Sequence, residues 1–300
     1  MTSDSRRPIS GIPTSSGLIP SVLRILAFVD ELPAGATGVL RLGQHGMILL
    51  ESRKICWAVA STMRVRLTDI LRNQSVPRLP KAAVEEICLQ AKASGRPIGE
   101  ALVASGLVSE AGLRSALLNH NGEAIAQLAR AGATPDDFTV HTRATYDPRF
   151  SFSPCELLAL LGALDDPARA TAAHLELGEM LVEESTGAAF ARNEMASGPL
   201  VIAVDGACDF PVRDLTQVCN WVSGLFDVVR TFQADACAAR VGWGERTALV
   251  TWRVKEVGYL GFCSSRASAA RLVAKLGQRA SADGGLDGPA HVVRVGGYPA

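Results

Sequence analysis

The chain has 300 residues, of which 48% are hydrophobic, so it can bury several cores and need not be disordered. Its 30 basic and 30 acidic residues cancel, which removes the electrostatic attraction that most nucleic-acid and anionic-membrane binders use. No apolar run approaches the ~20 residues that span a bilayer, and the N-terminus lacks the apolar core of a secretory signal. We therefore expect a cytoplasmic protein with no nucleic-acid partner and no membrane span.

Residues 1–78 predict an α-βββ-α module after a flexible N-terminus. Apolar residues between 18 and 29 recur on one helical face. Residues 37–60 then alternate as three short strands, with polar breaks at 43–46 and 51–54. A short helix over 67–71 closes the module. The residues expected to face the core are Leu40 and Leu42, then either Met47 with Leu49 or Ile48 with Leu50, then Ile55, Trp57 and Val59.

Residues 79–165 predict a helical module with a small β-element. Apolar residues follow helical periodicity, and glycines at 95, 106, 122 and 132 are expected to separate short helices. Residues 138–140 alternate as a strand does. Ser153 and Glu156 have the spacing of a capping box, with Pro154 at the first helical position, so a last helix is expected to start there.

Residues 166–282 predict an α/β sandwich with the element order α-ββ-α-βββ-α, and 283–300 form a tail. A helix near 177–181 precedes a strand over 200–204, a turn at Asp205-Gly206 and a short strand over 208–212. The clearest amphipathic helix covers 214–232. Strands over 235–241, 247–254 and 257–263 follow, and a helix over 269–276 closes the unit. The fold class expected for the whole chain is α+β.

The first module resembles the PATAN domain, a bacterial signalling module, over residues 17–76. The family pattern has a leading helix and then three strands that begin G-x-L, G-x-(I/L) and G-x-(I/L)-x-x-A. Residues 38–42, 46–50 and 54–58 correspond to those strands in the right order. The chain departs from the pattern at Ser52-Arg53, where an acidic residue and glycine are usual, and at the opening of the closing helix.

The middle module is similar to the helical half of N-terminal domains of type II secretion ATPases, some of which bind cyclic di-GMP. Apolar residues and glycines between 98 and 117 are in register with that pattern. The pattern's arginine falls on Pro97, next to Arg96, and its terminal glutamine falls on His120. The alternative hypothesis of a cyclic dinucleotide sensor would use Arg96, Gly99, Gly106 and His120 as ligand contacts.

The third unit resembles the Roadblock fold in its element order. Members of that family dimerise and commonly sit on small Ras-like GTPases or in regulatory scaffolds. The resemblance implies one sheet with strand order 2-1-5-4-3, and a dimer face on the strand 247–254 or on the helix 214–232. It also implies protein partners, with a small GTPase as the candidate class.

Residues with recognisable chemistry are few. The chain contains no G-x-x-x-x-G-K, H-E-x-x-H, G-x-S-x-G or G-x-G-x-x-G motif. Its seven cysteines form no C-x-x-C pair, so neither a disulfide framework nor a zinc site is indicated. We therefore predict no catalytic residue, no cofactor and no metal, and a non-enzymatic protein. An enzyme of an unrecognised kind stays the third hypothesis.

Two features are candidate interaction sites. Trp243 lies between glycines in an expected turn, where it is either a partner contact or an ordinary loop aromatic. Arg64 and Arg66 begin the only local basic excess, which continues through Arg72, Arg78 and Lys81. This excess is either a patch for an acidic partner or a solvated helix face. The sequence therefore predicts a homodimeric signalling or scaffold protein that acts through protein-protein interaction.

Overall fold

The computed structural model describes residues 18–74, 79–95, 98–141, 147–192, 198–205, 208, 210–232, 238–243, 247–282 and 293–295. The chain forms two compact units. Of the described residues, the meander unit contains those in 21–161 and 204–215, and the layered unit contains those in 162–203 and 216–295 together with 18–20. Both units combine helices with a sheet, and the strands come in consecutive runs that are separated by helices, which confirms the α+β class. Within the described residues, no helix is both long enough and apolar enough to cross a membrane.

The meander unit is built on a four-stranded antiparallel sheet with the order β3-β2-β1-β4. Its strands are β1 (Gly38–Arg41), β2 (Gly46–Glu51), β3 (Lys54–Ala60) and β4 (Asp137–Val140). Helix α1 (Leu18–Glu31) precedes them, and its predicted apolar face is buried. Of the two alternatives for β2, the structure has Ile48 and Leu50 facing the core, since both are buried whereas Met47 is 43% exposed.

The prediction of which β3 residues face the core is right for Ile55 but wrong for Trp57 and Val59, which are only half-buried. A β-bulge between Leu49 and Leu50 shifts the register of β3 against β2, and a bulge moves the following side chains to the opposite face. Cys56, Ala58 and Ala60 are therefore buried, while Trp57 is only half-buried. Alternation in the sequence could not reveal this shift, since the extra residue becomes visible only when the two strands pair.

The β2–β3 turn has positive φ at Ser52 (51°) and Arg53 (61°), without the glycine that such a turn favours. Three hydrogen bonds hold this conformation. The Ser52 N–H donates to Thr37 Oγ1 at 3.1 Å, and the Arg53 N–H donates to the Ala36 carbonyl at 2.9 Å. Arg53 Nη1 also donates to a backbone carbonyl at the end of α1 at 3.1 Å. The departure from the PATAN pattern at this turn is therefore compatible with a tight hairpin.

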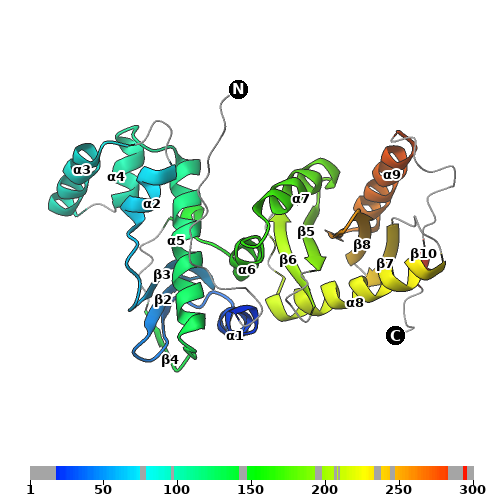
Figure 1. Ribbon diagram of the computed structural model, residues 1–300, viewed down its shortest axis with the longest axis horizontal. Helices are drawn as coiled ribbons and strands as arrows, with labels where there is room; N and C mark the ends of the chain where they lie inside the picture. The colour runs from blue at the N-terminus through cyan, green and yellow to red at the C-terminus, as the bar shows by residue number, and fades with distance from the viewer. Residues whose placement is uncertain are drawn as a thin grey trace. The chain divides into compact units, whose positions relative to one another are not determined.

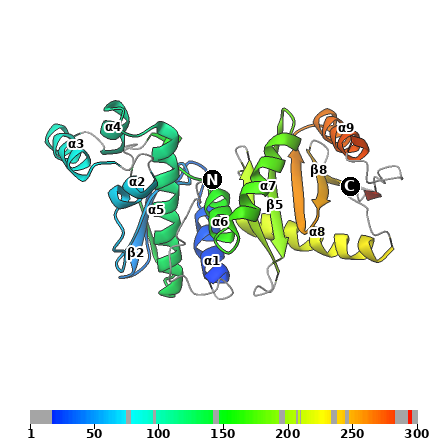
Figure 2. The same ribbon diagram turned by 45° about the horizontal axis from the view of Figure 1, so that its top comes forward.

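Helices α2 (Leu67–Gln74), α3 (Lys81–Ser94), α4 (Ile98–Ala104), α5 (Glu110–Arg130) and α6 (Pro154–Gly162) complete the meander unit, with a 3-10 turn η2 (Pro148–Phe150) before α6. The predicted capping box is confirmed: the Ser153 N–H donates to Glu156 Oε2, and the Glu156 N–H donates to Ser153 Oγ. Figures 1 and 2 show α5 running along the strands.

The helix break expected at Gly122 does not exist, because α5 continues through it. A Cβ at this position would meet Leu160 Cδ2 at 2.5 Å. The glycine therefore permits close approach of α6 to α5 rather than ending a helix. Gly95, Gly106 and Gly132 do follow helix ends with positive φ, as expected.

The expected boundary at 78/79 does not separate two units. Strand β4, from the predicted helical module, pairs with β1 through residues 137–140, and α5 packs along β3. The helical segment 79–141 therefore shares one sheet and one core with the β-meander. The second expected boundary, at 165/166, lies close to the observed change of unit at 161/162.

The outer edge of β3 is closed by two groups from distant parts of the chain. Ile55 and Phe152 exchange two backbone hydrogen bonds, of 2.8 and 3.0 Å. The Ala58 N–H donates to Asn121 Oδ1 at 2.8 Å, and Asn121 Nδ2 donates to the Cys56 carbonyl at 3.5 Å. Asn121 is fully buried. An asparagine on α5 thus provides the hydrogen bonds that a fifth strand would have supplied.

The layered unit is built on a sheet with the order β10-β7-β8-β9-β5-β6. Its elements are α7 (Pro167–Met180), β5 (Ser185–Arg192), β6 (Pro199–Asp205), α8 (Val212–Phe232), β7 (Ala238–Trp243), β8 (Thr247–Val254), β9 (Val257–Cys263), α9 (Arg266–Ala282) and β10 (Val293–Val295). Counted from β5, the first five strands have the order 2-1-5-4-3. This is the expected numbering, but its first two strands are not the segments that were expected to form them. Figure 1 shows α7 and α9 over one face of this sheet and α8 along the other.

The first hairpin of this unit is displaced from its expected position. Strand β5 occupies 185–192, where no strand was expected, and no strand forms over 208–212 in the described residues, since Val212 begins α8. Ala188 to Ala191 are buried in succession, because β5 lies between β9 and β6 under helices. Alanine favours helix in isolation, so this small-residue strand carries no β-signal in its sequence.

We predict that Asn121→Ala lowers the free energy of unfolding of the meander unit by about 1–3 kcal/mol, since it leaves a buried N–H of β3 without a partner. Urea denaturation followed by circular dichroism measures the loss. Hydrogen exchange of residues 54–60 should become faster in the variant.

Asn119→Ala is the matched control, because Asn119 bonds only within its own helix, to the Ser115 carbonyl. It should change stability by less than about 0.5 kcal/mol. Equal stability and equal exchange in the two variants would refute the role given to Asn121.

Candidate functional site

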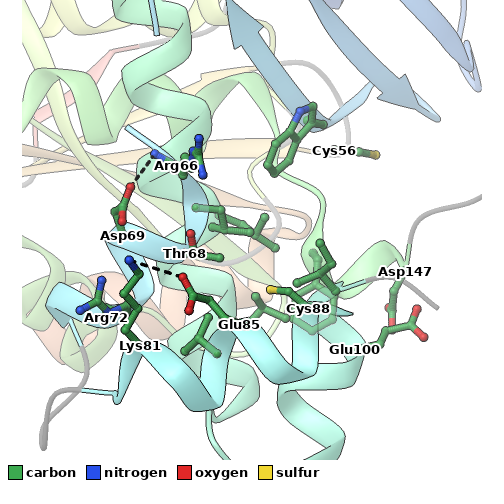
Figure 3. Close-up of a pocket in the computed structure, with 18 of the residues that line it drawn as sticks. Cys56, Arg66, Thr68, Asp69, Arg72, Lys81, Glu85, Cys88, Glu100 and Asp147 are labelled. Carbon is green, nitrogen blue, oxygen red and sulfur yellow. Dashed lines mark hydrogen bonds and ion pairs between the residues drawn. The ribbon is translucent and has the colours of Figure 1, made fainter. Parts of the chain in front are cut away.

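The described residues of the meander unit form a groove of about 920 Å³. It opens between α2, α3, α4 and α5, next to β3 and η2. Figure 3 shows its polar residues from above this set of helices. The lining residues are Cys56, Trp57, Arg66, Leu67, Thr68, Asp69, Arg72, Lys81, Val84, Glu85, Cys88, Gly95, Ile98, Gly99, Glu100, Leu113, Leu117, Asp147 and Phe150.

The floor of the groove is apolar and is organised by α5. Leu113 and Leu117 lie one turn apart on this helix and are buried. His120 follows on the same stripe and stacks against Trp57, with ring centroids 4.1 Å apart and planes at 27°. One face of the Trp57 ring is thus covered by His120, while the residue itself lines the groove.

Burial sets the protonation state of His120. The side chain is 3% exposed, and neither ring nitrogen makes a hydrogen bond of ordinary geometry. Loss of hydration lowers the pKa of His120, and the nearby backbone of Ala58 opposes this effect only in part. The imidazole is therefore held in its neutral form, which suits a ring packed against an indole.

One end of the groove is basic. Arg66, Arg72 and Lys81 gather there in Figure 3, around Asp69 and Glu85. Both carboxylates are already engaged: Asp69 Oδ2 accepts the Arg66 backbone N–H at 3.3 Å, and Glu85 Oε1 lies 3.5 Å from Lys81 Nζ.

The opposite end is acidic, and one of its two carboxylates, Asp147, is paired within the chain. Asp147 and Glu100 lie there in Figure 3. Arg149 donates to Asp147 through Nε and Nη2 at 2.9 and 2.6 Å, and its Nη1 lies 2.5 Å from Glu110. These hydrogen bonds lower the pKa of Asp147 and raise the pKa of Arg149. The two ends of the groove thus differ in the charge that is free to meet a ligand.

The two cysteines of the groove are not activated. Burial, followed by the charge of Glu51, raises the pKa of Cys56 to about 12. Burial and the charge of Glu85 raise the pKa of Cys88. A thiolate nucleophile needs a lowered pKa, so neither residue has the electrostatic environment of a catalytic cysteine. No cluster of three metal-ligating side chains occurs among the described residues.

The predicted ligand contacts of the middle module do not converge. Arg96 lies outside the described residues, although its neighbours Gly95 and Ile98 both line the groove. Gly99 also lines it, and a Cβ there would meet Leu113 Cδ2 at 2.9 Å, so this glycine allows α4 to approach α5. Gly106 does not line the groove, and His120 is buried behind Trp57.

The structure places the three predicted interaction residues in different environments. Arg66 lines the groove, whereas Arg64 is exposed outside it. Trp243 ends strand β7 instead of occupying a turn, and its side chain lies outside the described part of the structure. Trp221 is 46% exposed on α8.

Sequence reasoning missed the combination of Trp57, Arg66 and Arg72 in one groove. The run of basic residues after position 63 was a visible signal, but it carried no sign that an indole from a strand would lie nearby.

No family model matches the chain, and no curated protein matches its sequence.

We predict that acidification destabilises the protein partly through His120. Its folded pKa lies below the unfolded value of about 6.5, so the unfolded state binds more protons and stability falls as the pH drops through that value. Between about pH 7.5 and 5.5, the wild-type protein should therefore lose more unfolding free energy than His120→Phe, by at most about 1.4 kcal/mol per pH unit.

Denaturant unfolding at several pH values, followed by circular dichroism, measures this difference. His45→Gln, in the β1–β2 turn, is the control and should keep the wild-type pH dependence. A His120→Phe profile parallel to that of the wild type would contradict the neutral buried imidazole.

Proposed function

We propose that this chain is a non-enzymatic adaptor in bacterial cytoplasmic signalling, with a PATAN-like meander unit and a Roadblock-like layered unit that forms a homodimer. The observation that supports it best is the strand order 2-1-5-4-3 of the layered unit, with α7 and α9 over one face and α8 along the other (Figure 1). The element order α-ββ-α-βββ-α accompanies that topology.

The structure bears on which surface would dimerise. Strand β8 pairs with β7 on one side and β9 on the other, so it offers no free edge for strand addition. Helix α8 has an exposed stripe through Gln217, Asn220, Trp221 and Gly224. An exposed tryptophan beside a glycine suits the close approach of two copies of this helix, since tryptophan is enriched at interface centres. We assign the dimer face to α8.

The partner class proposed for the dimer is a small Ras-like GTPase, as the Roadblock resemblance implies. A two-fold dimer presents each surface twice, so the assembly could hold two partner molecules or link a partner to the meander unit of either copy. Capture from a bacterial lysate with GDP and with a non-hydrolysable GTP analogue tests this step. A retained GTPase that depends on the nucleotide would support it, and capture that recovers no GTPase would oppose it.

We predict that the full-length protein is a dimer at tens of micromolar and that Trp221→Asp raises the dimer dissociation constant at least about tenfold, because a charge would be buried at the helix contact. Light scattering coupled to size exclusion measures the mass of both proteins over a concentration series.

Leu175→Asp is the control, since Leu175 is a 63% exposed apolar residue on α7. It should leave the mass unchanged. A strict monomer in the wild type, or equal dissociation in both variants, would reject the dimer assigned to α8.

The cyclic dinucleotide alternative is weaker in this geometry. Only Gly99, together with the residues that flank Arg96, lines the groove, while Gly106 and His120 are displaced from it. Calorimetry with cyclic di-GMP tests this alternative directly. Binding that is lost in Arg96→Ala would revive it.

A further inference from the structure

The basic end of the groove contains two guanidinium groups without an acidic partner. Among the described residues, neither Arg66 nor Arg72 forms an ion pair or a side-chain hydrogen bond to a carboxylate. Arg72 Nε is in addition buried and makes no hydrogen bond. A buried donor left without a partner is destabilising, so a ligand that accepts a hydrogen bond from it would offset that cost.

The neighbouring acids do not supply that acceptor. Asp69 would be placed to pair with Arg72 three residues later on α2, but its Oδ2 accepts the backbone N–H of Arg66. Glu85 is engaged by Lys81 across one turn of α3. Arg66, directly before α2, and Arg72, on α2, thus remain available for an incoming anion, and their planar groups suit carboxylate or phosphate oxygens.

The same groove offers an aromatic surface. Trp57 is supported on one face by the buried ring of His120, at 4.1 Å, and lines the groove with the rest of its surface. Leu113 and Leu117 extend this apolar floor. A planar ring placed against Trp57 would meet an indole that is already held in position, so little ordering would be needed on binding.

The volume of the groove fits a small molecule. About 920 Å³ lies within the range of roughly 300–1,000 Å³ that is usual for ligand sites, in which apolar walls surround a few polar groups. We propose that this groove binds a small planar aromatic anion, whose ring stacks on Trp57 and whose phosphate or carboxylate group is held by Arg66 and Arg72. This inference goes beyond the adaptor function and does not depend on dimerisation through α8.

The experiment is calorimetry on the full-length protein with five probes. Guanosine 5′-monophosphate is an aromatic phosphate, and indole-3-acetate is an aromatic carboxylate. Guanosine keeps the ring without the charge, and inorganic phosphate keeps the charge without the ring. Cyclic di-GMP is the fifth probe. At least one aromatic anion should bind with a dissociation constant below about 1 mM, and at least about tenfold more tightly than guanosine and inorganic phosphate.

Three variants locate the site. Arg72→Gln and Arg66→Gln should each weaken the binding of the aromatic anion about tenfold or more, and Trp57→Leu should weaken it as well. Arg41→Gln is the matched control, because Arg41 is exposed on β1 away from the groove. The circular dichroism spectrum of each variant shows whether it is folded. If Trp57→Leu does not fold, the two arginine variants still test the site.

The outcomes distinguish a phosphate ligand from a carboxylate ligand. Stronger binding of the nucleotide would assign a phosphate ligand, and stronger binding of indole-3-acetate would assign a carboxylate. Absence of binding by every probe would overturn the proposal, as would equal affinity in wild type, Arg66→Gln and Arg72→Gln. Cyclic di-GMP binding that depends on Arg96 but not on Arg66 or Arg72 would also overturn it. None of these results would alter the mass measured for the Trp221 test.

Discussion

The outer edge of β3 is the constraint on which the meander unit depends. Its backbone groups cannot all pair with β2, and those that face away are satisfied by Phe152 and by the side chain of Asn121. Because a buried N–H without a partner is costly, this contact fixes α5 in rotation and in register along the strand. His120 precedes Asn121 and is thereby brought against Trp57. Leu117 and Leu113, earlier on the same helical stripe, then form the floor of the groove.

The charge at each end of the groove depends on which carboxylate and guanidinium groups are already paired within the chain. Helix α2 uses its one acidic residue, Asp69, near its own N-terminus, which leaves Arg72 without an internal partner. On the other side, Asp147 and Glu110 share Arg149. An isolated surface ion pair contributes only ~0–1 kcal/mol, so these contacts matter little for stability. What matters is which groups remain for a ligand: Asp147 is paired with Arg149, whereas among the described residues Arg66 and Arg72 form no ion pair with a carboxylate.

Sequence reasoning succeeded where one local pattern decides one local structure. The alternating strands, the Ser153–Glu156 capping box and the amphipathic α8 are of this kind. It failed where the deciding contact is distant. The buried face of β3 depends on a bulge formed with β2, and Gly122 is explained by the approach of Leu160. The groove is the extreme case, since Trp57, Arg72 and Leu113 come from three elements and no spacing in the sequence joins them.

In the layered unit, too, contacts with distant elements hide the pattern by which a strand would be predicted. Its central strands are covered on both faces. Every residue of β8 from Ala248 to Trp252 is therefore buried, and the buried part of β5 consists mostly of alanines. Continuous burial removes the period of two that identifies a strand with one solvated face. The order of elements was nevertheless predictable, because the helices and the β8–β9 hairpin carry clear signals and leave one arrangement for the rest. With the sheet faces covered, the exposed large apolar side chains of this unit among the described residues are Leu164, before α7, Leu175 on α7 and Trp221 on α8. Of these three residues only Trp221 presents an aromatic ring, so α8 is the helix that offers a partner an exposed aromatic surface.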